Sequence, residues 1–400
     1  MNTPQKPCKS SVVQPWLDDA AIAEWRKEFP VLQKKNYMAS CSQGPQSRRV
    51  RSALESYLEN WVSTGMDWDF WCQEVSLAKA EFAKMIGASP EEIAVSTSVS
   101  EIVSSVAGAF LPQNGRYKVV TTDAEFPTVG QVWLAHQKFG VQVDYVPVCQ
   151  GKIALSEYEQ RIDDKTLLAS VTHVYYQNGF KQDIAAIAEI CHAKGVPLLV
   201  DAYQSLGTME LDVKKQKIDM LCSGNLKYLL GIPGIAFLYV DARLADTLRP
   251  ANTGWFGQDD PFNFAARRLS FAPGARRFDT GTPPVMAAFA ARAGMETINQ
   301  VGLPAIEARI QQLNQCALQE ADRLELPLLS PRDLGQKGAV TAIQLSSDSH
   351  AMEETLKGMG IVASARGPAI RIAPHFFSLP QEVEQALQAI RQCIDSTPRR

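Results

Sequence analysis

Short apolar runs alternate with amphipathic stretches between about Glu91 and Val240. Near-continuous Val, Ile and Leu runs are typical of strands that are buried on both faces, and the stretches between them have the spacing of helices. The predicted strands cover residues 93–98, 117–123, 141–148, 166–174, 196–201, 218–224 and 235–240, and the predicted helices cover 100–110, 127–140 and 183–195. This alternation predicts an α/β domain with a mostly parallel sheet and helices on both sides.

The pattern changes after about Val285. Two long helical patterns, a pair of strands and a last amphipathic helix follow, at residues 285–302, 303–325, 339–347 with 370–376, and 379–395. Such a mixture predicts a smaller α+β domain. We therefore expect three parts: an N-terminal segment packed near the domain seam, a large domain and a small domain, at residues 1–35, 36–284 and 285–400.

Composition narrows the class of protein. The 400 residues are 46% hydrophobic and 21% charged, which is typical of a globular protein and excludes a disordered or fibrous one. The formal net charge of −3 gives no positive field that would attract nucleic acid. The longest apolar stretch, Leu229 to Tyr239, is interrupted by glycine and proline and is shorter than the ~20 residues of a membrane span.

The N-terminus lacks a basic region followed by an apolar one, so we expect no secretory signal and a cytoplasmic location. The eight cysteines have no metal-ligand spacing, and we interpret them as free thiols that serve mainly in packing, with no metal site.

Polar residues follow three of the apolar runs, at the carboxyl ends of strands where ligands bind in open α/β sheets. Asp201 closes one run, Gln204 lies three residues further on, and Lys227 follows the next run. Ser98 and Glu101 have capping-box spacing, which predicts a helix that begins there and directs its free N–H groups toward an anion such as a phosphate. No GxGxxG motif opens a helix after the first strand, which argues against a nicotinamide-linked Rossmann enzyme.

Together, Asp201, Gln204 and Lys227 resemble the pyridoxal phosphate (PLP) site of the fold-type I enzymes, specifically the class V aminotransferase family. That family includes cysteine desulfurases, isopenicillin N epimerase-like proteins and kynureninases. The resemblance extends from FPVLQKKNYMA near the N-terminus to APHFF near the C-terminus. It implies a fold-type I architecture, PLP as cofactor and an α-amino acid as substrate.

The resemblance also implies a role for each matching residue. Lys227 would form a Schiff base with the cofactor, Asp201 would contact its pyridine nitrogen, and Gln204 its phenolic oxygen. The remaining cofactor-binding candidates are Ser98, Val99 and Ser100 for the phosphate, Phe126 for stacking on the ring, and Ser223 and Asn225 upstream of the lysine. Tyr175 or Tyr176, of which we favour Tyr176, would lie on the substrate side of the ring. Arg371 would bind the α-carboxylate as a bidentate pair, with Arg366 as a second candidate.

The segment RFDTGTPP resembles a family loop that binds the cofactor phosphate of the other subunit. The match places Gly281 and Thr282 in that loop, so it implies a homodimer with shared active sites. Two features depart from the family. Leu226 precedes the lysine where the family often has His or another polar residue, and the loop that carries the reactive cysteine in desulfurases reads VASARGPAIRIAP and contains none. A persulfide-forming desulfurase would therefore lack its nucleophile.

These observations favour a PLP-dependent aminotransferase. A PLP-dependent lyase that breaks a C–S bond or eliminates a β-substituent, similar to kynureninases or sulfoxide lyases, is the alternative, because both reactions begin with loss of the same Cα proton. A catalytically inactive relative that acts as a binding or scaffold protein is an alternative from another class, and the presence of both Asp201 and Lys227 argues against it.

Overall fold

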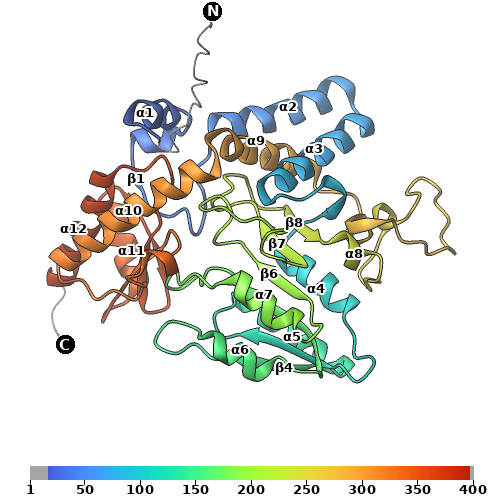
Figure 1. Cartoon of the computed structure of the whole chain (residues 1–400). Helices are drawn as coiled ribbons and strands as arrows, with labels where there is room; N and C mark the ends of the chain where they lie inside the picture. The colour runs from blue at the N-terminus through green and yellow to red at the C-terminus, as the bar shows by residue number, and fades with distance from the viewer. Residues whose placement is uncertain (1–16, 397–400) are drawn as a thin grey trace, which may run out of the picture.

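The computed structural model describes residues 17–396, so the first part of the expected N-terminal segment lies outside the described residues. A central seven-stranded sheet has the order β2-β8-β7-β6-β5-β3-β4 (Figure 1). Its strands are β2 (Ile93–Ser96), β3 (Lys118–Thr122), β4 (Gln142–Val146), β5 (Thr166–Thr172), β6 (Leu198–Asp201), β7 (Met220–Gly224) and β8 (Ala236–Val240). In this sheet β8 runs opposite to the other six strands, which run in one direction, and this confirms the predicted mostly parallel α/β fold.

Apolar residues cover both faces of the sheet, as the continuous apolar runs predicted. Leu198 and Val200 of β6 belong to one core with residues of the helices α3 (Trp68–Ile86), α7 (Ile184–His192) and α9 (Val285–Val301). Leu199 points to the opposite core, which contains residues of α4 (Val99–Ala109) and α5 (Pro127–Ala135). The shorter α6 (Leu155–Arg161) and α8 (Ala242–Ala245) complete this part of the molecule.

α9 packs against α2 (Arg48–Thr64) and α3, beside the large sheet. The ring of Phe289 in α9 lies 5.5 Å from both Tyr57 and Phe70, measured between ring centroids. The sequence analysis assigned α9 to the small domain, whereas its packing partners lie in the large one. The exact boundary at residue 285 stays a prediction.

The C-terminal part contains a three-stranded antiparallel sheet with the order β11-β12-β9. Its strands are β9 (Thr341–Gln344), β11 (Ser364–Arg366) and β12 (Ala369–Ile372), and its helices are α10 (Leu303–Arg323), α11 (Ser349–Gly358) and α12 (Pro380–Ser396). The strand pair β9 and β12 was expected, whereas the short β11 was not.

The N-terminal segment packs against the C-terminal part. Arg26 of α1 (Asp19–Lys27) forms an ion pair with Glu382 at 2.6 Å and donates a hydrogen bond to the Phe377 carbonyl. β1 (Asn36–Tyr37) pairs in parallel with β10 (Ile361–Val362). The short 3-10 helices of the described chain are η1 (Pro30–Gln33), η2 (Pro90–Glu92), η3 (His136–Phe139), η4 (Trp255–Gly257), η5 (Gly274–Phe278) and η6 (Leu334–Gln336).

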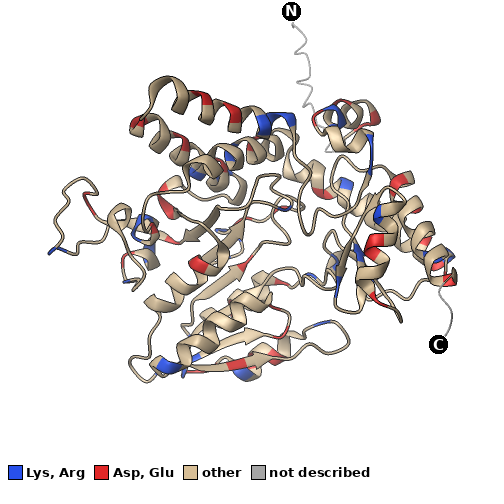
Figure 2. Ribbon diagram, turned by 180° about the vertical axis from the view of Figure 1, so that it is seen from behind, with Lys and Arg blue, Asp and Glu red and all other residues tan. Residues whose placement is uncertain are grey.

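Basic and acidic residues are interspersed along the ribbon of the helices, strands and loops (Figure 2). Within residues 17–396, no helix has the length and apolar character that a membrane span requires.

Candidate active site

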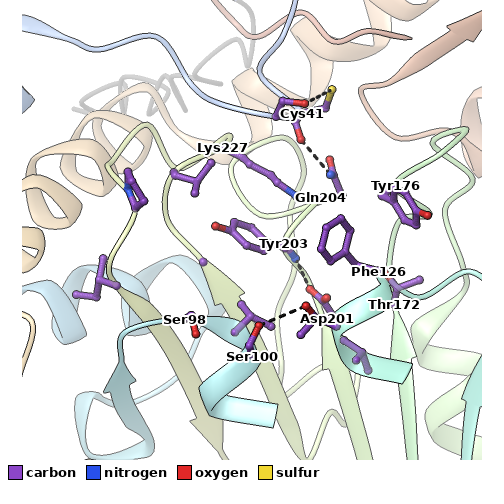
Figure 3. A pocket seen from close by; sticks show the side chains of 18 of the residues that line it. Cys41, Ser98, Ser100, Phe126, Thr172, Tyr176, Asp201, Tyr203, Gln204 and Lys227 are labelled. Atoms are coloured by element: carbon purple, nitrogen blue, oxygen red, sulfur yellow. Dashed lines mark hydrogen bonds between the residues drawn. The ribbon is translucent and has the colours of Figure 1, made fainter. Parts of the chain in front are cut away.

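A pocket of about 350 Å³ opens where the carboxyl ends of β2, β3, β5, β6 and β7 meet (Figure 3). The hairpin of β11 and β12 and the segment after β1 close its other side. Ten of the residues selected from the sequence line it: Ser98, Val99, Ser100, Phe126, Tyr176, Asp201, Gln204, Lys227, Arg366 and Arg371. Tyr175, the other tyrosine considered, is buried and does not line it.

Lys227 extends into the pocket between two aromatic rings. Its Nζ lies 4.2 Å from the centroid of the Tyr203 ring and 5.7 Å from that of Phe126. Burial lowers the pKa of the Lys227 amine from 10.5 to about 8; the nearby Asp201 opposes this shift, and Arg371 and Arg366 add to it. About a tenth of the amine is therefore neutral, and nucleophilic, at pH 7, far more than for an ordinary lysine.

Asp201 is buried at the end of β6, and its Oδ1 accepts a hydrogen bond of 2.9 Å from the Tyr203 N–H. Burial raises the pKa of this carboxyl, although the hydrogen bond from Tyr203 and the charge of Lys227 both act to lower it. A buried carboxylate with a raised pKa is stabilised by a cationic partner. The pyridinium N–H of PLP is such a partner, so this position fits the cofactor.

Gln204 also has hydrogen-bonding capacity to spare at the pocket. Its Nε2 donates a hydrogen bond of 3.1 Å to the Cys41 carbonyl, while its buried Oε1 has no partner among the described residues. Buried polar atoms are normally paired, so this amide fits a polar group of a ligand. The resemblance places the phenolic oxygen of the cofactor here.

The N-terminus of α4 faces the pocket, as the spacing of Ser98 and Glu101 predicted. Ser98 caps the helix by accepting a hydrogen bond of 3.2 Å from the Glu101 N–H. The Glu101 carboxylate accepts from the N–H of Thr97 instead of that of Ser98, so the expected capping box is displaced by one residue. Ser100 Oγ lies 3.3 Å from Thr128 Oγ1. Hydroxyls and free N–H groups thus converge where a phosphate would bind.

Arg371 is buried and held in place by the protein. It donates hydrogen bonds to the Tyr176 carbonyl at 2.6 Å, to Ser364 Oγ at 2.8 Å and to Ser42 Oγ at 3.1 Å. Its buried Nε has no hydrogen-bond partner within residues 17–396. A substrate carboxylate would meet the remaining N–H groups of the guanidinium together with these serine hydroxyls, and bidentate binding of that carboxylate stays a prediction.

Four residues selected from the sequence do not line this pocket: Ser223, Asn225, Gly281 and Thr282. Ser223 Oγ donates its hydrogen bond to the Gly224 carbonyl, and Asn225 is fully buried against Gly231. Their placement within and after a buried strand therefore does not support the expected contacts with the cofactor. Gly281 and Thr282 are exposed, and their role toward a second subunit stays a prediction.

The sequence analysis missed other residues of the pocket, among them Cys41, Ser42, Thr128, Thr172 and Tyr203. Cys41 corrects the assignment of the cysteines to packing, because this buried residue lines the pocket, with its Sγ 3.9 Å from Ser42 Oγ. No local signal marks Cys41 or Ser42, which reach the site only through tertiary structure. Tyr203 lies between Asp201 and Gln204 in the chain and could have been selected with them.

Comparisons with known proteins identify relatives along nearly the whole chain. The family model for class-V aminotransferases matches residues 37–386. The chain is 40% identical to the uncharacterized aminotransferase YcbU of Bacillus subtilis (strain 168), over 92% of this chain and 96% of that protein. It is 29% identical to a kynureninase of Deinococcus radiodurans, over 87% of each chain. The apo structure of a cysteine desulfurase from Thermococcus onnurineus NA1 has the same fold, with a TM-score of 0.84, 24% identity, and coverage of 94% of this chain and 98% of that one.

Proposed function

Because the chain belongs to the class V aminotransferase family and is thus a PLP-dependent enzyme, we propose that it is an aminotransferase that acts on an α-amino acid. The observation that carries this proposal is the pairing of Lys227 and Asp201 in one pocket, with the amine depressed in pKa by burial. The similarity to an aminotransferase over nearly the whole chain supports the choice of reaction.

The residues of the pocket divide the work. PLP, when its pyridine nitrogen is protonated, withdraws electrons from the Cα of a bound amino acid. Asp201 would keep that proton on the ring nitrogen, and Phe126 would pack on the face of the ring. Lys227 Nζ would take the proton from Cα and return it to the adjacent carbon of the cofactor, which is the step that defines transamination.

Substrate selection would depend on the hairpin of β11 and β12. Arg371 presents guanidinium N–H groups beside the hydroxyls of Ser42 and Ser364. Such a cluster suits the α-carboxylate of an amino acid, since hydrogen bonds to a charged group are stronger than neutral ones. Arg366 lines the same pocket and would add positive charge there.

A lyase is the second candidate, because the chain is also similar to kynureninase. The two reactions diverge after removal of the Cα proton and give different products. We would mix the holoenzyme with a panel of amino acids, record the cofactor absorbance, and assay ketoacid, pyruvate, ammonia and sulfide. Accumulation of the pyridoxamine form with one equivalent of ketoacid supports an aminotransferase. Release of pyruvate or a cleaved side chain without a second substrate supports a lyase.

We also propose that the enzyme is a homodimer, with Gly281 and Thr282 of one subunit near the cofactor phosphate of the other. Exposed apolar side chains lie on two helices that pack side by side, one before that loop in sequence and one after it: Trp61 and Val62 near the end of α2 are 55% and 82% exposed, and Met286 near the start of α9, four residues after Thr282, is 45% exposed. Contact between Tyr57 and Phe289 holds these two helix ends side by side. An exposed apolar patch of this kind is typical of a subunit interface.

A further inference from the structure

The Tyr203 side chain occupies a position that is built into the pocket wall. Its ring lies directly over Gly224, where a Cβ atom would be 2.1 Å from the ring Cζ and 2.2 Å from the hydroxyl oxygen. Only glycine leaves room for the ring in this place. The phenol is thus fixed against the backbone segment that leads into Lys227.

Between Gly224 and Lys227, the only residue with a side chain that lines this wall is the apolar Leu226. Ser223 and Asn225 do not line the pocket, and Leu226, which does, is apolar. Donors for an anion are otherwise provided by the opposite wall, where the N-terminus of α4 presents Ser98 and Ser100. A phosphate with donors on one side only would leave the oxygens that face Leu226 without a hydrogen bond.

The Tyr203 hydroxyl points toward the side of the pocket where the cofactor phosphate would bind. In Figure 3 the Tyr203 hydroxyl points away from Gln204 and toward the side of the pocket on which Ser98 lies. Gln204 marks the side expected for the phenolic oxygen of the cofactor, and the phosphate is attached on the other side of the pyridine ring. Burial and the charge of Asp201 raise the pKa of the Tyr203 hydroxyl, so it stays protonated and able to donate.

We propose that the Tyr203 hydroxyl donates a hydrogen bond to the phosphate of PLP, on the wall where the Leu226 side chain offers no donor. The proposal assigns a cofactor-binding role to a residue outside the helix N-terminus. It rests on the proposed function only in taking PLP as the cofactor.

The test compares PLP with pyridoxal, which has the same ring and aldehyde but no phosphate. Dissociation constants of both would be measured on apoprotein of the wild type, of Tyr203→Phe and of Tyr176→Phe, by absorbance titration. Tyr176→Phe is the matched control, because it removes a phenol from the substrate side of the same pocket. We expect Tyr203→Phe to weaken PLP binding about ten-fold or more and to leave pyridoxal binding within about two-fold of the wild type.

Each other outcome is decisive. Equal weakening of PLP and pyridoxal in Tyr203→Phe would overturn the proposal, since the hydroxyl would then act on the ring or on Lys227. Unchanged PLP binding in Tyr203→Phe would overturn the proposal as well, because the hydroxyl would then contribute nothing to the affinity for PLP. If Tyr176→Phe instead loses the preference for PLP over pyridoxal, the phosphate binds near Tyr176 and the proposal is wrong. If the wild type fails to bind PLP at all, the proposed function itself is wrong.

Discussion

The Lys227 amine has a pKa near 8 because it is buried, which makes its reaction with PLP depend on pH. The neutral amine is the reactive form, and its fraction rises with pH and reaches one half at about pH 8, whereas an ordinary lysine with a pKa of 10.5 would remain mostly protonated there. We expect the rate of PLP incorporation into apoprotein to rise with pH, to reach half of its maximum at about pH 8 and to level off above about pH 9, as measured by stopped-flow absorbance.

Lys227→Ala provides the control, since it should abolish both turnover and the borohydride-reducible bond to the cofactor. A rate of PLP incorporation that keeps rising beyond pH 10 would show that burial does not lower the pKa of the Lys227 amine.

Asp201 is the second residue whose chemistry can be isolated. Asp201→Asn keeps the shape of the side chain at the end of β6 but cannot hold a proton on the pyridine nitrogen by charge. We expect kcat/KM to fall by about 100-fold or more while the circular dichroism spectrum and Tm of the protein stay close to the wild type. Near-normal turnover in this variant would remove Asp201 from the mechanism.

Arg371 allows the substrate class to be tested. Removal of a charge-assisted hydrogen bond costs about 1.5–3 kcal/mol, so Arg371→Ala should weaken amino-acid binding by about ten- to a hundred-fold and leave the resting cofactor spectrum unchanged. Arg371→Lys should recover only part of the affinity, because lysine lacks the planar guanidinium. Simple amines without a carboxylate are the comparison. If amines and amino acids lose affinity equally, the arginine supports the hairpin instead of binding the carboxylate.

At the scale of elements, the ends of the strands decide which side chains can enter the pocket. β7 ends with Gly224, and the Tyr203 ring occupies the space in which a Cβ would lie. The parallel pairing of β6 with β7 brings these two chain segments together. The glycine at the end of β7 thus determines where the side chain of Tyr203, two residues after the end of β6, can lie.

Gly224→Ala should therefore displace the Tyr203 ring and weaken the retention of PLP about ten-fold or more, as measured by dialysis followed by absorbance. Gly358→Ala is the matched control, because a Cβ at this position of α11 would meet no atom within 4 Å. We expect that variant to keep the wild-type affinity. Unchanged retention of PLP in Gly224→Ala would mean that the ring can move without cost.

At the scale of the whole molecule, the proposed homodimer can be tested at the exposed apolar side chains near the ends of α2 and α9. Val62→Glu places a charge on the most exposed of these side chains, at 82% exposure. We expect the wild type to sediment as a dimer. In Val62→Glu the dissociation constant of the dimer should be about ten-fold higher or more. Phe139→Glu, which alters an exposed ring on η3, away from α2 in Figure 1, is the control and should remain dimeric. A wild-type monomer with full PLP affinity would contradict the dimer.

The sequence by itself determined the strands of the large sheet, because strands buried on both faces need continuous apolar runs that are visible locally. It also determined Asp201, Gln204 and Lys227 as candidates, because residues at the carboxyl ends of parallel strands must meet at one edge. The beginning of α4 at Ser98 followed from the capping requirement of a helix.

Only the tertiary structure decided which distant segments complete the site. Cys41 and Ser42 enter the pocket from the segment after β1, and Ser42 meets Arg371 across 329 positions of the chain. The packing of α9 on α2 and α3, and the fit of Tyr203 over Gly224, likewise depend on which surfaces approach one another. Periodicity along the chain records whether a side chain is buried, but it does not record its partner, because that partner is chosen by the close packing of elements that are far apart in sequence.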